Sequence, residues 1–297
     1  MITLAPAKIN LSLRITGKRE DGFHGLETLV LPITSLCDEL EFTAADTYSL
    51  CCDSTGIPTD ETNLVSRALR LFEKESGLPC PYHITLTKRI PHGAGLGGGS
   101  ADAAHTFLAL NDLTDAGIPL DTMAGWAAQL GSDIPLFLYE KPCWCSGRGT
   151  VIEPSDLTWD LPIVLFKPAF DIPTPWAYSR WKDSQKIPSI SYEAQEAGGQ
   201  QLFNDLERPV FEKHRFLATL RTHLQDQDES LAAMMSGSGS TVFAVLDPAA
   251  DADAFAKRTL KAMDPTLWWH HHPAAALIEQ SDLHLAEPSE PKEQIAN

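Results

Sequence analysis

The chain has 297 residues, of which 43% are hydrophobic, and this length and composition allow two globular domains of ordinary size. Its formal net charge of −17 argues against general binding to nucleic acid or to anionic membrane surfaces. No apolar run reaches the length of a membrane span, and the first residues lack a signal-peptide pattern, so we expect a cytoplasmic protein. Six cysteines without a C-x-x-C pair indicate reduced, structural thiols rather than a zinc site.

The first predicted element is a strand over residues 2–15. Apolar side chains such as Ile9 and Leu11 alternate with polar ones, and alternate residues of a strand share a face. Lys8 and Asn10 therefore point to the same face, opposite the apolar one. A solvated strand face explains this pattern equally well at this point. A polar loop and three further predicted strands follow, at residues 17–25, 26–33, 39–43 and 48–52.

A glycine-rich loop joins a predicted strand at 83–90 to a predicted helix at 101–110. The loop and the first helical residue are Pro91, His92, Gly93, Ala94, Gly95, Leu96, Gly97, Gly98, Gly99, Ser100 and Ala101. Ser100 can cap the helix, whose first N–H groups lack partners within the helix. Because glycine has no Cβ, backbone N–H groups can wrap closely around an anion at this helix start. The loop therefore predicts a phosphate-binding site.

Other kinds of loop fit this pattern less well. Gly93-x-Gly95-x-x-Gly98 satisfies the dinucleotide-binding fingerprint, but that pattern is weak by itself. A Rossmann first strand is apolar on both faces, whereas residues 83–90 alternate and predict a half-exposed antiparallel strand. A Walker A loop ends in Gly-Lys-Ser/Thr, and no lysine follows these glycines. A flexible turn is the remaining alternative, although glycine linkers rarely sit between a strand and a capped helix.

Helices are also predicted at 63–77 and 121–130, with Asp121 as a candidate cap of the second. Asp133 then stands between a helix end and an apolar run. A carboxylate that enters a buried segment needs a partner or a function, and a turn cap explains it equally well. A hairpin of two strands is predicted over residues 144–152.

The composition becomes polar near residues 155–160, where we place a domain boundary. We expect domains at 1–157 and 158–285, and a charged, disordered tail at 286–297. A small-residue turn at 234–241 can supply further backbone donors, although a plain hairpin turn explains it as well. The adjacent histidines at 270–272 do not favour a metal site, because neighbours in a strand face opposite sides. The other predicted elements are strands at 161–166 and 242–246, a loop turning into a helix at 170–178, and helices at 202–224 and 249–263.

Three motifs stand in order along the chain, at Pro6–Leu11, Pro91–Ala104 and Ser236–Gly239. This order resembles the GHMP kinases, the small-molecule kinases named for galactokinase, homoserine kinase, mevalonate kinase and phosphomevalonate kinase. Within that superfamily, the Ala-Lys-Ile-Asn-Leu start, Asp21–His24 and Leu130–Pro135 resemble a particular group. Its members phosphorylate a cytidine-diphosphate derivative of methylerythritol on the non-mevalonate route to isoprenoid precursors.

The resemblance implies a two-domain α+β fold with the active site in the cleft between domains. It implies ATP and Mg²⁺ as cofactors and a small cytidine-diphosphate substrate whose 2-hydroxyl receives the γ-phosphoryl group. Asp133 matches the family's general base, Lys8 its electrostatic partner, and residues 91–101 the loop that holds the ATP phosphates. The residues implied on the substrate side are Asn10, Phe23, His24, Thr174, Tyr178, Ser236 and Gly237. Metal ligands stay open, and we expect no nucleic-acid or membrane partner and a monomer or weak homodimer.

Two positions depart from the family pattern. Phe23 stands where the family usually has tyrosine, but stacking on a cytosine face requires only the ring. Thr150 stands where glutamate is common, and we assign this change no consequence. Tyr178 best matches the second cytosine-stacking aromatic of the family, with Trp176 as the alternative.

Three other functions remain open on the sequence. A mevalonate or homoserine kinase is disfavoured by Phe23, His24 and Tyr178, because those substrates carry no base to stack. A non-catalytic nucleotide-binding protein on this fold is disfavoured by the presence of both Lys8 and Asp133. A dehydrogenase that uses the glycine loop for NAD is the third.

Overall fold

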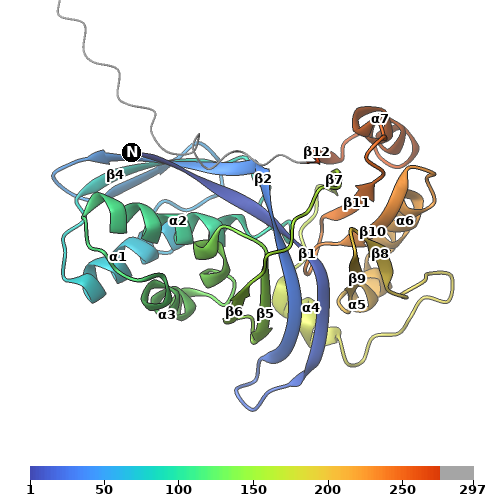
Figure 1. Cartoon of the computed structure of the whole chain (residues 1–297), viewed down its shortest axis with the longest axis horizontal. Helices are drawn as coiled ribbons and strands as arrows, with labels where there is room; N and C mark the ends of the chain where they lie inside the picture. Colours follow the sequence, from blue (N-terminus) through green and yellow to red (C-terminus); the bar gives the residue numbers. More distant parts are fainter. Residues whose placement is uncertain (275–297) are drawn as a thin grey trace, which may run out of the picture.

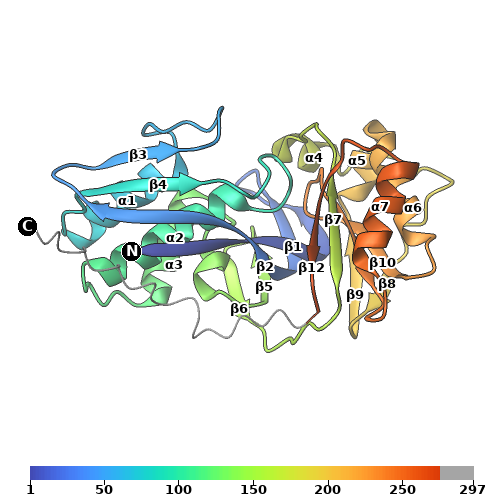
Figure 2. The ribbon, with the colours of Figure 1, turned by 90° about the horizontal axis from the view of Figure 1, so that it is seen from above.

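The computed structural model describes residues 1–274 and arranges them in two bodies, each built on a β-sheet (Figure 1). Seen from above, the long strands β1 (Ile2–Lys18) and β2 (His24–Ala44) extend from one body toward the other (Figure 2). This mixture of helices and strands confirms the expected α+β class. The predicted domain end at 285 and the predicted tail at 286–297 lie outside the described residues.

The first sheet has eight strands, and its main path runs β3-β4-β2-β1-β9-β8. Off this path, β5 pairs with β2, and β6 pairs with β5. The expectation of two separate strands at 26–33 and 39–43 is wrong, because both belong to β2. The register of the pairing with β1 shifts between Pro6 and Ala7, because Thr34–Leu36 of β2 bulge out of the ladder. Strand β2 continues through this bulge. The shorter strands of this sheet are β3 (Ser49–Cys52), β4 (Tyr82–Thr87), β5 (Cys143–Gly147), β6 (Val151–Pro154), β8 (Gln195–Ala197) and β9 (Gln200–Asn204).

Three helices and a 3₁₀ turn lie on one side of the first sheet (Figure 1). Their buried phenylalanines, Phe72 and Phe107, share a core with Leu40 and Ile84 of the sheet. Full burial of such a side chain contributes about 1.5–3 kcal/mol to the stability of the fold. These elements are α1 (Leu64–Ser76), α2 (Gly98–Leu113), α3 (Leu120–Leu130) and η1 (Pro135–Tyr139).

The predictions of the helix ends are correct for α1 and wrong for the start of α2. Helix α1 ends as predicted, since the Asn63 side chain accepts from an amide of the first turn and Gly77 adopts a left-handed φ of 73°. The prediction that Ser100 caps α2 is wrong. Gly97 is the N-cap, with a φ of 75°, and Ser100 lies inside the first turn. Glycine at the cap leaves the helix N-terminus open to an approaching group, because no side chain covers its amides.

The predicted cap of α3 is also wrong. Pro119 precedes the helix, and Asp121 lies in the first turn, where a negative charge is favourable beside the positive end of the helix dipole. The Asp121 carboxylate accepts a hydrogen bond from the Tyr139 hydroxyl at 3.1 Å. The strand predicted to Ile90 ends at Thr87, because the next residues turn toward a buried carboxylate described below.

The second sheet is antiparallel, in the order β10-β11-β7-β12. Its strands are β7 (Ile163–Lys167), β10 (Ser230–Met235), β11 (Val242–Leu246) and β12 (Trp268–His272). Its helices are α4 (Thr174–Arg180), α5 (Glu207–Lys213), α6 (Arg215–Gln225) and α7 (Ala252–Ala262). The helix predicted at 202–224 is partly wrong, because residues up to Asn204 form β9, which pairs with β1 and β8. Pro209 is tolerated in the first turn of α5, where a missing N–H costs no intrahelical bond.

The apolar face of β1 packs against the second sheet, as its alternation predicts. Ile9 and Leu11 are fully buried in one cluster with Leu165 of β7 and Phe243 of β11. This core joins the two bodies and leaves the polar face of β1 directed to the opposite side. Within the part of the chain that the structure describes, no helix is both long and apolar enough to cross a bilayer.

The three adjacent histidines alternate along β12 as expected. The Ser35 hydroxyl lies 2.9 Å from His270 Nε2 and 2.8 Å from His272 Nδ1. Ser35 belongs to β2, so this contact attaches the edge of the second sheet to the first. Among residues 1–274, no group of three or more histidine, cysteine or acidic side chains could hold a metal ion.

Candidate active site

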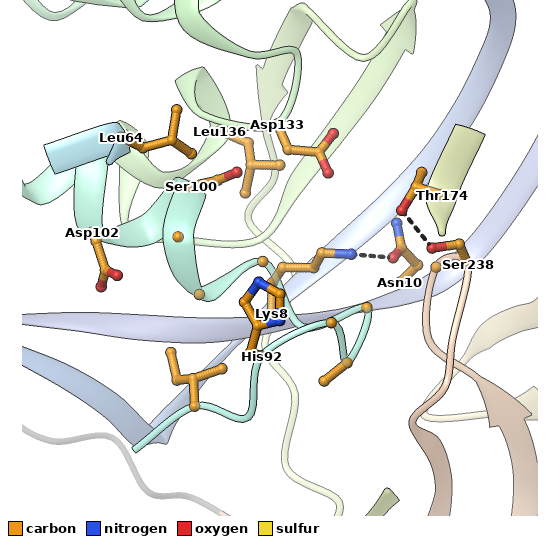
Figure 3. Close-up of a pocket in the computed structure, with 18 of the residues that line it drawn as sticks. Lys8, Asn10, Leu64, His92, Ser100, Asp102, Asp133, Leu136, Thr174 and Ser238 are labelled. Carbon is orange, nitrogen blue, oxygen red and sulfur yellow. Dashed lines mark hydrogen bonds between the residues drawn. The ribbon is translucent and has the colours of Figure 1, made fainter. Parts of the chain in front are cut away.

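A cavity of about 410 Å³ lies between the two bodies. The first body contributes the polar face of β1, the glycine loop and the turn at Asp133, whereas the second contributes α4 and the turn after β10. Most of the predicted site residues line this cavity (Figure 3). They are Lys8, Asn10, Pro91, His92, Gly93, Ala94, Gly95, Gly97, Gly98, Gly99, Ser100, Asp133, Thr174, Tyr178 and Gly237. Leu96 and Ala101, which were predicted with them, are buried in the core instead.

Lys8 and Asn10 lie on the same face of β1, as predicted. The Lys8 ammonium donates to Asn10 Oδ1 at 2.6 Å, and Asn10 Nδ2 donates to the Thr28 hydroxyl at 2.8 Å. Only 4% of Lys8 is exposed, so its charge is held inside the cavity wall. Burial lowers the pKa of Lys8 below the usual range for lysine, and the Asp133 carboxylate opposes that shift. The position of Asp133 therefore helps to keep this ammonium charged.

Asp133 lies in the turn between α3 and η1. Figure 3 shows its carboxylate and the Lys8 ammonium directed into the same space. Gly149, in the turn between β5 and β6, has a φ of +96°, and a Cβ there would lie 3.8 Å from Asp133 Oδ1. Cys145 also lines the cavity, but burial raises the pKa of its thiol to about 12, so it adds no charge near neutral pH. The Asp133 carboxylate and the Lys8 ammonium thus lie in the same part of the cavity.

The glycine loop is held by its carbonyl groups. Ala94 O accepts from Thr241 N at 3.1 Å, Gly95 O from the Ser236 hydroxyl at 3.0 Å, and Leu96 O from Lys8 N at 2.9 Å. In a trans peptide the following N–H points opposite to the carbonyl, so the amides of Gly95, Leu96 and Gly97 are turned away from these partners. Together with the open N-terminus of α2, these amides are the donors that the predicted anion cradle requires.

Gly97→Val is expected to weaken ATP binding. A Cβ at Gly97 would lie 2.6 Å from Phe137 Cζ and 3.2 Å from Lys8 Cγ, and the φ of +75° disfavours any branched residue. Loss of one hydrogen bond to a charged phosphate costs about 1.5–3 kcal/mol, so we expect Kd to rise roughly 10- to 150-fold. Isothermal titration calorimetry with ATP measures it. Gly117→Val is the matched control, because Gly117 has a φ of +62° and no atom within 4 Å of its virtual Cβ. Equal ATP affinity in wild type and Gly97→Val would show that the loop does not hold the ATP phosphates.

A buried charge cluster beneath the loop escaped the sequence analysis. The Lys88 ammonium donates to Asp38 Oδ2 and, at 2.7 Å, to Asp102 Oδ2. Asp38 Oδ1 accepts the backbone amides of Arg89 and Ile90, which orients the chain as it enters the loop. Burial raises the pKa of Asp102, and the Lys88 ammonium opposes this shift. Asp102 Oδ1 has no hydrogen-bond partner among the described residues, although Asp102 and Lys88 both line the cavity.

A sequence signal for this cluster existed. A carboxylate within the apolar start of a helix needs a partner when it is buried, which is the argument applied to Asp133. The segment before α1 also lines the cavity, through Ile57, Pro58 and Thr62 among others. No periodic pattern marked that segment, and only the fold brings it beside the glycine loop.

The residues predicted to recognise the cytosine base, His24, Tyr178 and Phe23, differ in their burial and in their neighbours. The ring centroids of His24, the first residue of β2, and Tyr178 of α4 are 5.6 Å apart, and Tyr178 lines the cavity whereas His24 does not. Burial raises the pKa of Tyr178, which keeps its phenol protonated. Phe23 is 53% exposed and lies beneath the Arg148 guanidinium, outside the cavity wall. Trp176 packs on His214 and is therefore less well placed than Tyr178.

The turn after β10 forms the opposite wall. Ser236 is fully buried and acts through its bond to the glycine loop rather than by lining the cavity. Gly237 has a φ of +54°, and a Cβ there would lie 3.1 Å from Asn10 Oδ1 and 3.2 Å from Lys8 Nζ. The Ser238 hydroxyl, which the sequence analysis did not single out, lies 2.8 Å from the Thr174 hydroxyl (Figure 3).

Comparison with known proteins gives the same family for both bodies. Residues 63–141 match the model of the GHMP kinases N terminal domain, and residues 192–263 match that of the GHMP kinases C terminal domain. A 4-diphosphocytidyl-2-C-methyl-D-erythritol kinase from Methylacidiphilum infernorum is 41% identical over 251 residues, which is 82% of this chain and 85% of that protein. The enzyme of the same name from Chlorobium phaeobacteroides is 37% identical over 261 residues, covering 84% of this chain and 91% of the relative.

Solved structures agree with the sequence matches. The crystal structure of a 4-(cytidine 5'-diphospho)-2C-methyl-D-erythritol kinase aligns with a TM-score of 0.72 at 34% identity, covering 91% of this chain and 98% of that one. A homoserine kinase from Cytophaga hutchinsonii aligns with a TM-score of 0.66 at 18% identity, covering 91% and 93% of the two chains. The second likeness concerns the fold alone.

Proposed function

This chain belongs to the 4-diphosphocytidyl-2-C-methyl-D-erythritol kinases within the GHMP kinases, and from that premise we propose its reaction and the residues that perform it. It is a small-molecule kinase of the non-mevalonate isoprenoid pathway. The proposed reaction transfers the γ-phosphoryl group of ATP to the 2-hydroxyl of 4-diphosphocytidyl-2-C-methyl-D-erythritol. The observation that carries this proposal is one cavity lined by Lys8, Asp133 and the glycine loop.

Asp133 acts as the general base. A hydroxyl is a poor nucleophile, so its proton must pass to a carboxylate as the new bond forms between oxygen and the γ-phosphorus. The bond from that phosphorus to the β–γ bridging oxygen breaks, and ADP leaves. Most of the barrier is lowered by alignment and by neutralisation of charge on the transferring group. The facing walls of the cavity provide the alignment, because the loop comes from one body and α4 from the other.

The Lys8 ammonium stabilises the negative charge that develops on the transferring phosphoryl group. Asn10 fixes its direction through the 2.6 Å hydrogen bond, and Thr28 fixes Asn10 in turn. The Asp133 carboxylate in turn favours the charged form of Lys8, because it opposes the effect of burial on the Lys8 pKa. Asp133 thus supports the charged state that the role of Lys8 requires.

The ATP phosphates bind the turned amides of Gly95–Gly97 and the N-terminus of α2. A Cβ at Gly95 would lie 2.4 Å from Ser236 O, and one at Gly97 would lie 2.6 Å from Phe137 Cζ, so glycine is what lets the loop pack this closely against its neighbours. Mg²⁺ would neutralise charge between the β- and γ-phosphates. In proteins it takes one or two side-chain oxygens and completes its shell with phosphate and water. The hydroxyl of Ser100 and the unpartnered Asp102 Oδ1 are oxygens that suit it.

The decisive assay offers three acceptors to the purified protein with ATP: the cytidine-diphosphate substrate, mevalonate and homoserine. Phosphorylation of the first alone is the expected result. Turnover of mevalonate or homoserine in its place would overturn the proposed acceptor. Protection against thermal unfolding by ATP but not by NAD is the expected companion result, and protection by NAD would indicate the dehydrogenase. The cytoplasmic location and the monomer or weak homodimer stay predictions.

Tyr178→Ala is expected to weaken binding of the cytidine substrate. We propose that Phe23, His24 and Tyr178 form the cytosine pocket, with Tyr178 supplying a stacking ring. Stacking of one base on one aromatic is worth about 1–3 kcal/mol, so Kd should rise roughly 5- to 150-fold. Phe23→Ala should behave alike, and Phe23→Tyr should be nearly neutral because the ring remains. ATP affinity should hardly change.

Trp176→Ala is the matched control for this prediction, since it removes a larger ring from the same helix where it packs on His214. Calorimetry with the cytidine substrate measures each Kd. If Tyr178→Ala and Phe23→Ala both bind as tightly as wild type, the cytosine pocket is wrong. If Tyr178→Ala alone weakens binding, the exposed Phe23 has no part in it, and the His24–Tyr178 pair accounts for recognition.

A further inference from the structure

Asn204 ends strand β9, which pairs in parallel with β1, the strand that carries Lys8. Leu13 of β1 is its register partner, and only 6% of Asn204 is exposed. The side chain therefore lies behind the cavity wall, between the strand that positions Lys8 and the turn that follows β10. A buried amide in such a place requires hydrogen-bond partners for all its polar atoms.

The Asn204 amide is fully bonded. Its Nδ2 donates to Met235 O at 2.7 Å and to Gly237 O at 2.8 Å, while Oδ1 accepts from Leu206 N at 2.9 Å. The two carbonyls require donors and the backbone amide requires an acceptor, so this network also fixes the orientation of the side chain. Asparagine alone among side chains of this size supplies two donors and one acceptor in this arrangement.

These bonds determine which way the turn presents its backbone. The Gly237 carbonyl is drawn toward Asn204, so in a trans peptide the Ser238 N–H points in the opposite direction. Gly237 and Ser238 line the cavity, and the virtual Cβ of Gly237 lies 3.2 Å from Lys8 Nζ. Met235 N donates to Glu207 Oε1 at 2.9 Å, which fixes the start of the same turn.

We propose that Asn204 is a positioning residue, which holds the Gly237–Ser238 peptide so that the Ser238 amide donates a hydrogen bond to an anionic phosphate oxygen beside Lys8. The inference rests on the proposed kinase function for the identity of that oxygen. Asn204 thus affects turnover by orienting the backbone of the turn, and its own side chain does not contact the substrate.

Asn204→Asp tests this assignment. The new carboxyl keeps an acceptor for Leu206 N but places a second oxygen against two carbonyls. We expect kcat to fall roughly 10- to 100-fold, as for other small misplacements of a catalytic group, while KM for ATP stays close to wild type. Because the carbonyls disfavour the charged form, its pKa should be raised. Protonation on lowering the pH then restores one donor, so the ratio of variant to wild-type kcat should rise as pH falls.

The ratio is used because the neighbouring carboxylates Asp205 and Glu207 are present in both proteins. Asn111→Asp is the matched control, since Asn111 Nδ2 donates to Ile118 O and its Oδ1 accepts from Ile118 N, far along α2 from the cavity. It should change neither kcat nor the pH dependence. Amide hydrogen exchange should speed up across residues 235–241 in Asn204→Asp and not in the control.

A kcat equal to wild type in Asn204→Asp, or an equal loss in Asn111→Asp, would overturn the positioning role. Should Asn204→Asp fail to fold, Asn204→Ser keeps one hydroxyl donor without a charge, and the same kcat loss is expected of it. If wild type does not phosphorylate the cytidine substrate, the proposed function fails instead. Hydrogen exchange across 235–241, and ATP hydrolysis without an acceptor, then still test Asn204 separately.

Discussion

Asp133→Asn is expected to lower kcat by about 10²–10⁴-fold while the fold and ATP binding persist. The amide has nearly the shape of the carboxylate, but it cannot accept the proton of the attacking hydroxyl. In the proposed site ATP binds through the glycine loop and the start of α2 rather than through Asp133, so the calorimetric Kd for ATP should be close to that of wild type. Steady-state kinetics with the cytidine substrate measure the loss in kcat.

Asp251→Asn is the control for removal of one carboxylate. Asp251 caps α7 by accepting from Ala254 N, and an asparagine there can do the same. Its kcat should equal that of wild type. An Asp133→Asn variant within threefold of wild type would exclude Asp133 as the base, whereas simultaneous loss of ATP binding would mean that the substitution disturbs the cavity as a whole.

The parts of the site that the sequence predicted are those in which local pattern and chemistry coincide. Alternation along β1 put Lys8 and Asn10 on one face because the opposite face is a core, and the structure has Ile9 and Leu11 in it. Glycines between a strand and a helix predicted a binding loop, and the structure has this loop in the cavity wall. The helix predicted at 63–77 matches α1, and Gly77 ends it as predicted, because capping depends on the backbone of a few neighbouring residues.

The missed parts depend on contacts between distant segments. The Lys88 cluster joins a residue of β2 to one at the end of β4 and one of α2, and no periodicity links these positions. The Ser100 cap failed for a different reason. A serine is the better cap by propensity, but Gly97 can adopt the φ of 75° that lets the loop pass close to Phe137 and Lys8. At the start of α2, contacts between the loop and distant side chains outweighed the higher capping propensity of serine.

The place of Asn204 illustrates the same limit. Residues 202–224 predicted a helix from composition, and the strand β9 exists because β1 and β8 offer it hydrogen-bonding partners. Only after that pairing does Asn204 reach the turn after β10, about 30 positions later in the chain, as its bond to Met235 O shows. A side chain whose partners are backbone carbonyls leaves no compositional signal at all.

Lys8→Met is the second substitution with a large expected effect. The methionine chain occupies much of the same volume but brings no charge, so it removes the cation that we propose to face the transferring phosphoryl group. Removal of one such electrostatic contact typically costs about 10²–10³-fold in kcat. It also leaves Asn10 Oδ1 without its donor, which should cost about 1–3 kcal/mol of stability, so thermal unfolding must be measured alongside. Lys74→Met, at an exposed lysine, controls for the change in net charge and should leave kcat unchanged.

The pH dependence distinguishes this role from a merely structural one. Burial lowers the pKa of Lys8, so in wild type the charged form is lost as pH rises through a value below that of ordinary lysine. If Lys8 acts as an ammonium, kcat should fall along that alkaline limb, and the limb should be absent from the residual activity of Lys8→Met. Asp133→Asn removes the carboxylate that opposes the shift, so its alkaline limb should move to lower pH. A wild-type profile that stays flat up to the pKa of ordinary lysine, with kcat of Lys8→Met within threefold of wild type, would show that the ammonium takes no part in phosphoryl transfer.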